Sequence, residues 1–377
     1  MKIKQITLKE IGLPLKHPFE TSFGVTTERR IIIVEALDES GIAGYGECTA
    51  MEQPLFNHES VDAAWTVILG SVCAILSSAR SWSAELVVSA LSALKGNRMA
   101  IAAVENAIWD LEAKLLSKPL WQHLGGVQKT IKTGVSIGLQ RSVEALLEKV
   151  AVEIDAGYQR IKLKIKPGQD VALVEAVRSR FGDILLSVDA NSAYTLDDLQ
   201  IFKDLEDYNL LMIEQPLQAG DLIDHAKLQE KITTPICLDE SITCLRDAEQ
   251  ALEIDACRII NIKLGRVGGH TEAKRIQELA RSRNIPVWCG GMLETGIGRA
   301  HNIAMATLPG FTLPGDISAS ARYWEEDIVE NPVTVNLDGT IDAPAGVGIG
   351  FEVRNDVVDR LCTRSDTFVF STASIVA

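Results

Sequence analysis

Five charged residues recur at a nearly constant interval in the middle of the chain. They are separated by 25, 25, 25 and 24 residues and are, in order, Lys164, Asp189, Glu214, Asp239 and Lys263. Each of them closes a short apolar run, which is the pattern of a buried strand in a parallel sheet. Because the carboxyl ends of barrel strands meet at one rim, this register predicts that all five charges serve one site.

The three acids of this series are candidate ligands for a divalent metal. Asp189, Glu214 and Asp239 end three consecutive strands, so their carboxylates would converge. Oxygen ligands in a partly open shell suit Mg²⁺, which keeps water or substrate oxygens in its other positions. We therefore expect Mg²⁺, with Mn²⁺ able to substitute. The alternative is that each acid pairs with a neighbouring lysine or caps the following helix.

Three lysines are candidate bases. Lys162 and Lys164 lie on one face of the same strand, by period two. Nearby like charges depress each other's pKa, which would make one of them a usable base near neutral pH. Lys263 would place a second base across the barrel, unless these lysines only form structural ion pairs with the acids. With a metal, the set predicts removal of a proton next to a carboxylate.

Alternating strands and helices are the elements that must position these charges. The expected strands are residues 135–139, the five charged runs, 286–290 and a weak eighth at 312–317, with helices such as 143–154 and 297–306 between them. No helix of ordinary length is expected after the eighth strand. The pattern predicts an α/β fold, a (β/α)8-type TIM barrel modified to (β/α)7β, over residues 128–323.

The first 127 residues predict an α+β capping domain. Strands are expected at 2–13, 30–37 and 44–48, and helices within 58–117. Residues 14–29, between the first two strands, hold Phe19 and Phe23 and predict either a surface loop or a mobile lid over a ligand. Residues 324–377 are expected to return to the capping domain.

Composition limits the classes of partner. The net charge is -14, and no basic cluster opposes it, which argues against nucleic acid. The seven cysteines, odd in number and without a close C-x-x-C pair, predict reduced thiols in a cytoplasmic protein. The most hydrophobic stretch, residues 66–76, is much shorter than the roughly 20 residues that span a bilayer. We expect no membrane partner.

Several motifs together resemble a known family. They are Lys162-Leu-Lys164, Asp189-Ala-Asn191, Glu214-Gln-Pro216, Asp239-Glu-Ser241 and Lys263, with Gly44-Tyr-Gly-Glu-Cys48 and Ala103-Val-Glu-Asn-Ala-Ile-Trp-Asp110 nearer the N-terminus. On these motifs the chain resembles the enolase superfamily, in its muconate-lactonizing-enzyme subgroup. Within the subgroup it is most similar to the o-succinylbenzoate synthases and N-succinylamino acid racemases. That similarity lies in Lys263-Leu-Gly-Arg-Val-Gly-Gly269, Gly290-Gly-Met-Leu-Glu-Thr-Gly296 and Pro314-Gly-Asp316.

The resemblance implies a role for each matching residue. Lys164 would be the base, tuned by Lys162, and Lys263 would stabilise the enolate in a dehydration or act as the second base in a racemisation. Asp189, Glu214 and Asp239 would bind the metal. The substrate would contact Ser136, Asn191, Arg266 and the backbone N–H groups of Gly291 and Met292, under an apolar cover of Phe19, Phe23, Met51 and Phe56. For Arg266, a salt bridge at the rim is the alternative.

The expected function is that of a Mg²⁺-dependent carbon–oxygen lyase. It would dehydrate 2-succinyl-6-hydroxy-2,4-cyclohexadiene-1-carboxylate to o-succinylbenzoate in menaquinone biosynthesis, with N-succinylamino acid racemisation as a second activity. The substrate would be a small carboxylate with a succinyl group, and the enzyme a homo-oligomer. Dipeptide epimerases are disfavoured, because Asp316-Ile-Ser318 stands where they carry an Asp-x-Asp pair.

Other functions stay open from the sequence. One is muconate cycloisomerase, or another subgroup enzyme acting on acid sugars or amino-acid derivatives. A rival in chemistry is a metal-free barrel lyase with Lys164 or Lys263 as Schiff-base nucleophile. That reading leaves the three acids without a role. A rival in class is a non-catalytic binding protein, which the complete series of charges disfavours.

Overall fold

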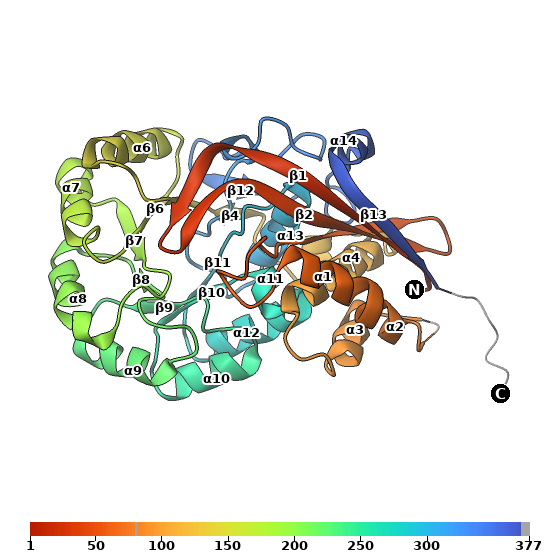
Figure 1. Cartoon of the computed structure of the whole chain (residues 1–377), viewed down its shortest axis with the longest axis horizontal. Helices are drawn as coiled ribbons and strands as arrows, with labels where there is room; N and C mark the ends of the chain where they lie inside the picture. Colours follow the sequence, from red (N-terminus) through yellow and green to blue (C-terminus); the bar gives the residue numbers. More distant parts are fainter. Residues whose placement is uncertain (80, 371–377) are drawn as a thin grey trace.

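A parallel sheet and an antiparallel sheet organise the molecule. The computed structural model describes residues 1–79 and 81–370 of the 377-residue chain. Figure 1 shows the parallel strands ringed by helices on one side. On the other side lies the antiparallel sheet, with a group of helices packed against it.

The parallel sheet has seven strands in the order β11-β10-β9-β8-β7-β6-β5. All neighbours in it are parallel. The α/β barrel predicted from the spacing of the charged runs is confirmed. Its strands are β5 (Gly134–Ile137), β6 (Arg160–Lys164), β7 (Leu185–Asp189), β8 (Ile213–Glu214), β9 (Ile236–Leu238), β10 (Ile259–Ile262) and β11 (Val287–Cys289).

Helices cover the outside of this sheet. Their N-termini follow ordinary capping chemistry, as at α6, where the side chain of Ser142 accepts a hydrogen bond from the N–H of Ala145. The helix then buries Leu146 and Val150 against the strands. The covering helices are α6 (Val143–Asp155), α7 (Val171–Phe181), α8 (Leu199–Leu205), α9 (Leu222–Lys231), α10 (Leu245–Glu253), α12 (His270–Ser282) and α13 (Gly296–Ala306), with the short α11 (Leu264–Val267) after β10.

The eighth strand expected at residues 312–317 does not form. The segment closes the barrel instead through isolated bridges, Val287 with Phe311 and Thr133 with Gly315. Asp316 also donates its N–H to the carbonyl of Cys289 at 2.8 Å. Pro314 lacks an N–H for a strand ladder, which explains why the pairing stays local.

The antiparallel sheet has the order β13-β1-β2-β3. Helix α4 (Arg98–Leu115) packs against β3 so closely that two positions there must be glycine. A Cβ atom on Gly44 would lie 2.2 Å from the carbonyl oxygen of Ala107, and one on Gly46 would lie 2.1 Å from that of Ala103. The strands are β1 (Ile3–Thr21), β2 (Gly24–Asp38), β3 (Ala43–Cys48) and β13 (Cys362–Val369).

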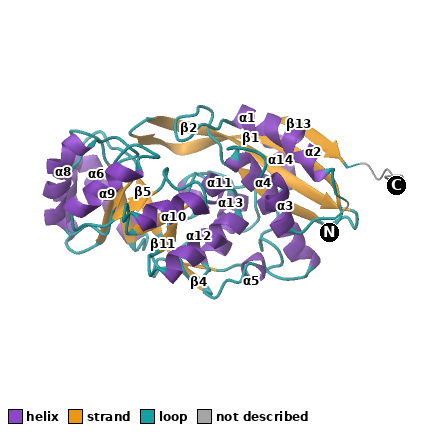
Figure 2. Cartoon of the chain, turned by 90° about the horizontal axis from the view of Figure 1, so that it is seen from below, coloured by secondary structure: helices purple, strands orange, loops and turns teal. Residues whose placement is uncertain are grey.

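A long hairpin replaces the loop expected at residues 14–29. Strands β1 and β2 continue through this segment to a tight turn at Ser22 and Phe23, with a break in register between Pro14 and Phe19. The tip docks on the barrel, because Glu20 accepts the N–H of Leu139 at 3.0 Å. Figures 1 and 2 show the hairpin reaching from the capping helices across to the barrel strands.

The remaining elements complete the two sheets' surroundings. Helices α1 (Val61–Val67), α2 (Cys73–Leu76), α3 (Ala84–Leu91) and α5 (Leu120–His123) belong to the N-terminal part, β4 (Thr130–Lys132) pairs with β12 (Thr340–Asp342), and α14 (Asn355–Leu361) precedes β13. Within the described residues, none of the helices is both long and apolar enough to cross a bilayer. All seven cysteines are free thiols.

Candidate active site

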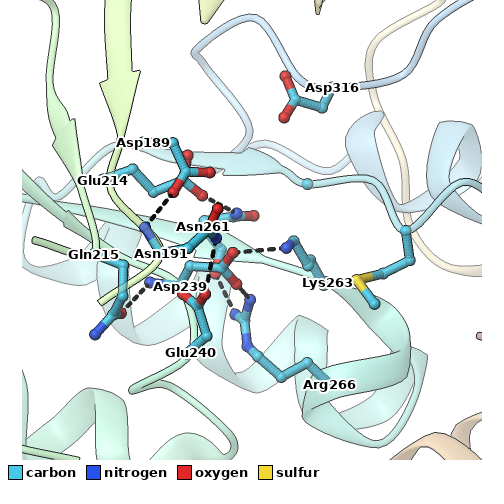
Figure 3. Close-up of polar contacts among 12 residues, drawn as sticks. Asp189, Asn191, Glu214, Gln215, Asp239, Glu240, Asn261, Lys263, Arg266 and Asp316 are labelled. Atoms are coloured by element: carbon cyan, nitrogen blue, oxygen red, sulfur yellow. Dashed lines mark hydrogen bonds and ion pairs between the residues drawn. The ribbon is translucent and has the colours of Figure 1, made fainter. Parts of the chain in front are cut away.

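The register of the parallel strands brings the five periodic charges to one rim. Lys164 lies opposite Asp189, and Asp189 lies opposite Glu214. Asp239 and Lys263 are the first residues after β9 and β10. All five are buried, and Figure 3 shows the acids and Lys263 gathered at this rim. The interval of about 25 residues therefore corresponds to one strand-and-helix unit of the barrel.

Two of the lysines pair with acids at the ends of opposite strands. The Nζ of Lys164 lies 2.6 Å from Oδ2 of Asp189 and donates to Oδ1 of Asn191 at 2.6 Å. The Nζ of Lys263 lies 2.6 Å from Oδ2 of Asp239 and 4.5 Å from the centre of the Phe56 ring. These are the ion pairs that the sequence left open as the alternative to catalysis.

Lys162 is surrounded by carboxylates. Its Nζ lies 2.6 Å from Asp316, 2.8 Å from Glu214 and 3.2 Å from Asp189. Burial lowers the pKa of Lys162, but the charges of Asp316, Glu214 and Asp189 outweigh burial and raise it well above its ordinary value. The expectation that a neighbouring lysine depresses this pKa is wrong for Lys162, because three acids stand closer in effect than one like charge.

The acids divide according to the cations beside them. Against the effect of burial, Lys164 and Lys162 hold the pKa of Asp189 well below its usual range. Lys263 and Arg266 likewise lower that of Asp239. Burial, followed by the negative charge of Asp189, raises the pKa of Glu214 to about 8. Glu214 is thus the member of the set whose negative charge is least compensated.

The donor chemistry of this set fits a hard divalent cation. Three carboxylates at adjacent strand ends supply oxygen ligands, and the raised pKa of Glu214 reflects a site where further positive charge would be favourable. In residues 1–79 and 81–370, no three His, Cys, Asp or Glu side chains already stand in a metal-binding arrangement. Ammonium and guanidinium groups bridge the acids instead, so a bound cation requires at least Lys162 to shift from between Asp189 and Glu214.

Some residues that order the rim were missed in the sequence. Asn261 donates its side-chain N–H to Glu214 at 2.7 Å, and Gln215 accepts the backbone N–H groups of Asp239 and Ser241 at 3.0 and 3.2 Å. Asn261 stands two residues before Lys263, so strand periodicity could have placed it on the same face. Gln215 has φ +38°, a conformation that only its surroundings can hold.

Asp316 has a larger part than its motif suggested. It pairs with the guanidinium group of Arg160 as well as with Lys162. Both cations lie over the ring of Trp288, at 4.4 and 4.8 Å from its centre. The residues after β11 thus hold the first lysine of Lys162-Leu-Lys164 from the far end of the barrel sequence.

One cavity opens beside this rim, under the hairpin. It encloses about 480 Å³, part of it open to solvent, which is within the usual size of a ligand pocket. The four predicted cover residues all line it, as do five of the predicted polar and backbone contacts. The lining consists of Phe19, Thr21, Phe23, Thr26, Arg29, Met51, Phe56, Lys164, Asn191, Lys263, Gly291, Met292 and Leu293.

Two predicted substrate contacts lie outside this lining. Ser136 is buried on β5. Arg266 donates to the carbonyl of Ile242 at 2.7 Å and forms an ion pair with Asp239, so it has the salt bridge that was the alternative reading. Met292 lines the cavity, but its N–H donates to Glu294 at 2.8 Å and is already engaged.

Two family models match the chain. Residues 3–125 match the N-terminal domain of the mandelate racemase / muconate lactonizing enzyme family, and residues 145–357 match the enolase C-terminal domain-like family. Together these matches cover most of both sheets and their helices.

Similar proteins span nearly the same length. The chain is 48% identical over 360 residues to an o-succinylbenzoate synthase of Geobacillus stearothermophilus, covering 96% of each chain. It is 47% identical over 361 residues to an N-succinylamino acid racemase of Thermus thermophilus, covering 96% of this chain and 97% of the other. A crystal structure of an enolase-superfamily member from Listeria innocua superposes with a TM-score of 0.95 at 42% identity, covering 98% of this chain and 100% of that one.

Proposed function

This chain belongs to the enolase superfamily, with the two domains of its mandelate racemase / muconate lactonizing enzyme branch, and from that premise we propose that it is an o-succinylbenzoate synthase. The reaction is the dehydration of 2-succinyl-6-hydroxy-2,4-cyclohexadiene-1-carboxylate, so the enzyme is a carbon–oxygen lyase. The identity of 48% to a synthase over 96% of both chains supports this substrate.

One observation carries the proposal. Lys164 and Lys263 leave the ends of strands β6 and β10 and line the same cavity. Each is held by a different acid, Asp189 or Asp239. Such an arrangement puts one base on each side of a substrate carbon, next to acids suited to a cation. A binding protein has no need of it.

We propose that Asp189, Glu214 and Asp239 hold Mg²⁺. When bound, the cation offsets the negative charge that develops on the substrate carboxylate as the neighbouring carbon loses its proton. The ordered side chains of Asn261 and Gln215 support this role, because they fix Glu214 and the backbone at Asp239.

The remaining work belongs to side chains of this protein. Lys164 takes the proton from the carbon next to the carboxylate, and Asn191, 2.6 Å from its Nζ, orients it. The ammonium group of Lys263 offsets charge from the other side. The abstracted proton and the departing hydroxyl group leave as water, and the ring becomes aromatic. Phe19, Phe23, Met51 and Phe56 keep water from the reacting carbon.

Racemisation of N-succinylamino acids is a second proposed activity. The same two lysines on opposite sides of the cavity favour it, since one can remove the α-proton while the other returns a proton to the opposite face. The identity of 47% to an N-succinylamino acid racemase supports it.

A side-by-side assay tests both activities. The purified chain is given the cyclohexadiene substrate, an N-succinylamino acid and cis,cis-muconate, each with Mg²⁺ and with excess EDTA. We expect dehydration and racemisation with Mg²⁺ and neither in EDTA. Activity that persists in EDTA, together with trapping of a substrate adduct by borohydride, would reject the metal-assisted reaction in favour of a Schiff base. Turnover of muconate alone would reject the proposed substrate.

A further inference from the structure

Arg29 is a buried arginine in the wall of the cavity, and the sequence gave no reason to single it out. It stands on β2, opposite Leu13 of β1, and only 3% of its surface is exposed. The next residue, Arg30, is on the opposite face of the sheet, where Glu10 and Asp62 pair with it at 2.8 and 2.9 Å. Two adjacent arginines therefore have opposite surroundings.

Arg29 lacks the partners that a buried guanidinium usually has. Its Nη2 donates to the carbonyls of Thr49 at 2.8 Å and Ala50 at 3.5 Å, while its buried Nε has no hydrogen-bond partner among the described residues. The acids nearest in electrostatic effect, Glu47 and Glu294, are engaged elsewhere. Glu47 accepts backbone N–H groups at the start of α13, and Glu294 accepts one from its own loop.

The other cations of the cavity lining are already neutralised. Lys164 and Lys263 each lie 2.6 Å from a carboxylate oxygen at the barrel rim. Among the lining residues that the structure describes, Arg29 is the cation without a carboxylate at hydrogen-bond distance. An arginine stays charged in proteins, and a buried charge without a counterion is unfavourable. An anionic group of a ligand would supply that counterion.

We propose that Arg29 binds the distal carboxylate of the substrate, the one at the far end of the succinyl group. This inference rests on the proposed function, because it assumes a substrate with two separated carboxylates. The reacting carboxylate lies at the barrel rim, between Lys164 and Lys263, and the distal one meets Arg29 on the capping hairpin. The apolar side chains of Phe19 and Phe56 line the space with them. Arg29 is thus a specificity residue that selects a succinyl group over a neutral acyl group.

A comparison of two substrates tests the wild-type protein without any substitution. One is an N-succinylamino acid, and the other is the matching N-succinamoyl compound, in which a neutral amide of nearly the same shape replaces the distal carboxylate. We expect kcat/KM to be about 100-fold lower for the amide, since a buried charge is then left unpaired. Equal kcat/KM values for the two would overturn the proposal.

Substitution at position 29 separates binding from structure. In Arg29→Met we expect kcat/KM for the succinyl substrate to fall about 100-fold, mostly through KM, while the amide changes by less than about 5-fold. Arg29→Lys should lie between, because it keeps the charge and loses the planar fork. Arg30→Met removes an arginine from the opposite face and should keep the wild-type preference. An equal loss on both substrates in Arg29→Met would assign Arg29 to a structural role.

Binding of succinate separates this inference from the proposed function. If the wild-type chain turns over neither substrate, the proposed function has failed, and the site is judged by calorimetry with succinate in the presence of Mg²⁺. We expect succinate to bind at least about 10-fold more weakly to Arg29→Met than to the wild type. The same affinity in both proteins would contradict an anion site at Arg29.

Discussion

Replacement of Asp316 by asparagine should destabilise the protein far more than an ordinary lost ion pair. Asp316 is 9% exposed, and it contacts Lys162 at 2.6 Å and Arg160, whose side chains are 3% and 0% exposed. Asparagine has nearly the same shape but no charge. One of its two side-chain termini is a donor, which would face a cation that also donates.

The size of the effect follows from burial. Removal of one partner from a buried ion pair costs about 3–5 kcal/mol, because the other charge stays without a counterion. Here two cations lose one acid, and Arg160 already has two nitrogens without partners among the described residues. Glu214 and Asp189 still contact Lys162, which keeps the expected loss in the free energy of unfolding within that range.

The chain offers a matched control at its surface. Asp359 lies 2.6 Å from Lys9 and is 63% exposed, so the pair has the same length in water. Asp359→Asn should cost less than about 1 kcal/mol. Urea unfolding of both variants and the wild type, in EDTA so that bound cations add nothing, measures the two losses. Equal losses would refute the reasoning that burial at Asp316, rather than contact distance, sets the energy.

Three further predictions concern the rim and one buried acid beside it. Asp239→Asn should weaken Mg²⁺ binding in calorimetry and lower turnover, and wild-type affinity for Mg²⁺ would reject Asp239 as a ligand. Lys164→Ala and Lys263→Ala should each abolish α-proton exchange with deuterated solvent for one enantiomer of an N-succinylamino acid, and undiminished exchange of both enantiomers in both variants would reject the two-base scheme. Burial raises the pKa of Glu47 to about 7 from an ordinary value of 4.5, so its protonated form favours the folded state. That contribution is complete below pH 4.5 and is lost as pH rises through 7. Between these limits Glu47→Gln should lose about 3 kcal/mol less stability than the wild type in urea unfolding, and parallel pH profiles would contradict the raised pKa.

The periodic charges were predictable because geometry fixes their interval. A strand, a helix and two turns take about 25 residues in this barrel, so equal spacing in sequence becomes one rim in space. The ends of β6, β7 and β8 lie in direct register, as the spacing of Lys164, Asp189 and Glu214 predicts. The apolar cover could also be named, although from resemblance and not from periodicity.

The errors arise where the answer depends on partners remote in sequence. The pKa of Lys162 follows from Asp316, over 150 positions later, and strand periodicity shows only Lys164. Arg266 folds back onto Asp239 and leaves the cavity, a choice that a helix pattern does not encode. The hairpin was taken for a loop because Lys16, His17 and Pro18 interrupt the alternation. Its strands nevertheless continue on either side of that break.

The pairing of β1 with β13 bears on how the chain folds as it is synthesised. Gln5 stands opposite Val369 in the antiparallel sheet, so the two strands are made at opposite ends of translation. At 5–20 residues per second, β1 leaves the ribosome roughly 20 to 70 s before its neighbour exists. During that time its free edge is open to other chains, which is a route to aggregation. Conditions that slow elongation should therefore lower the soluble yield of this protein more than that of a barrel whose edges close locally.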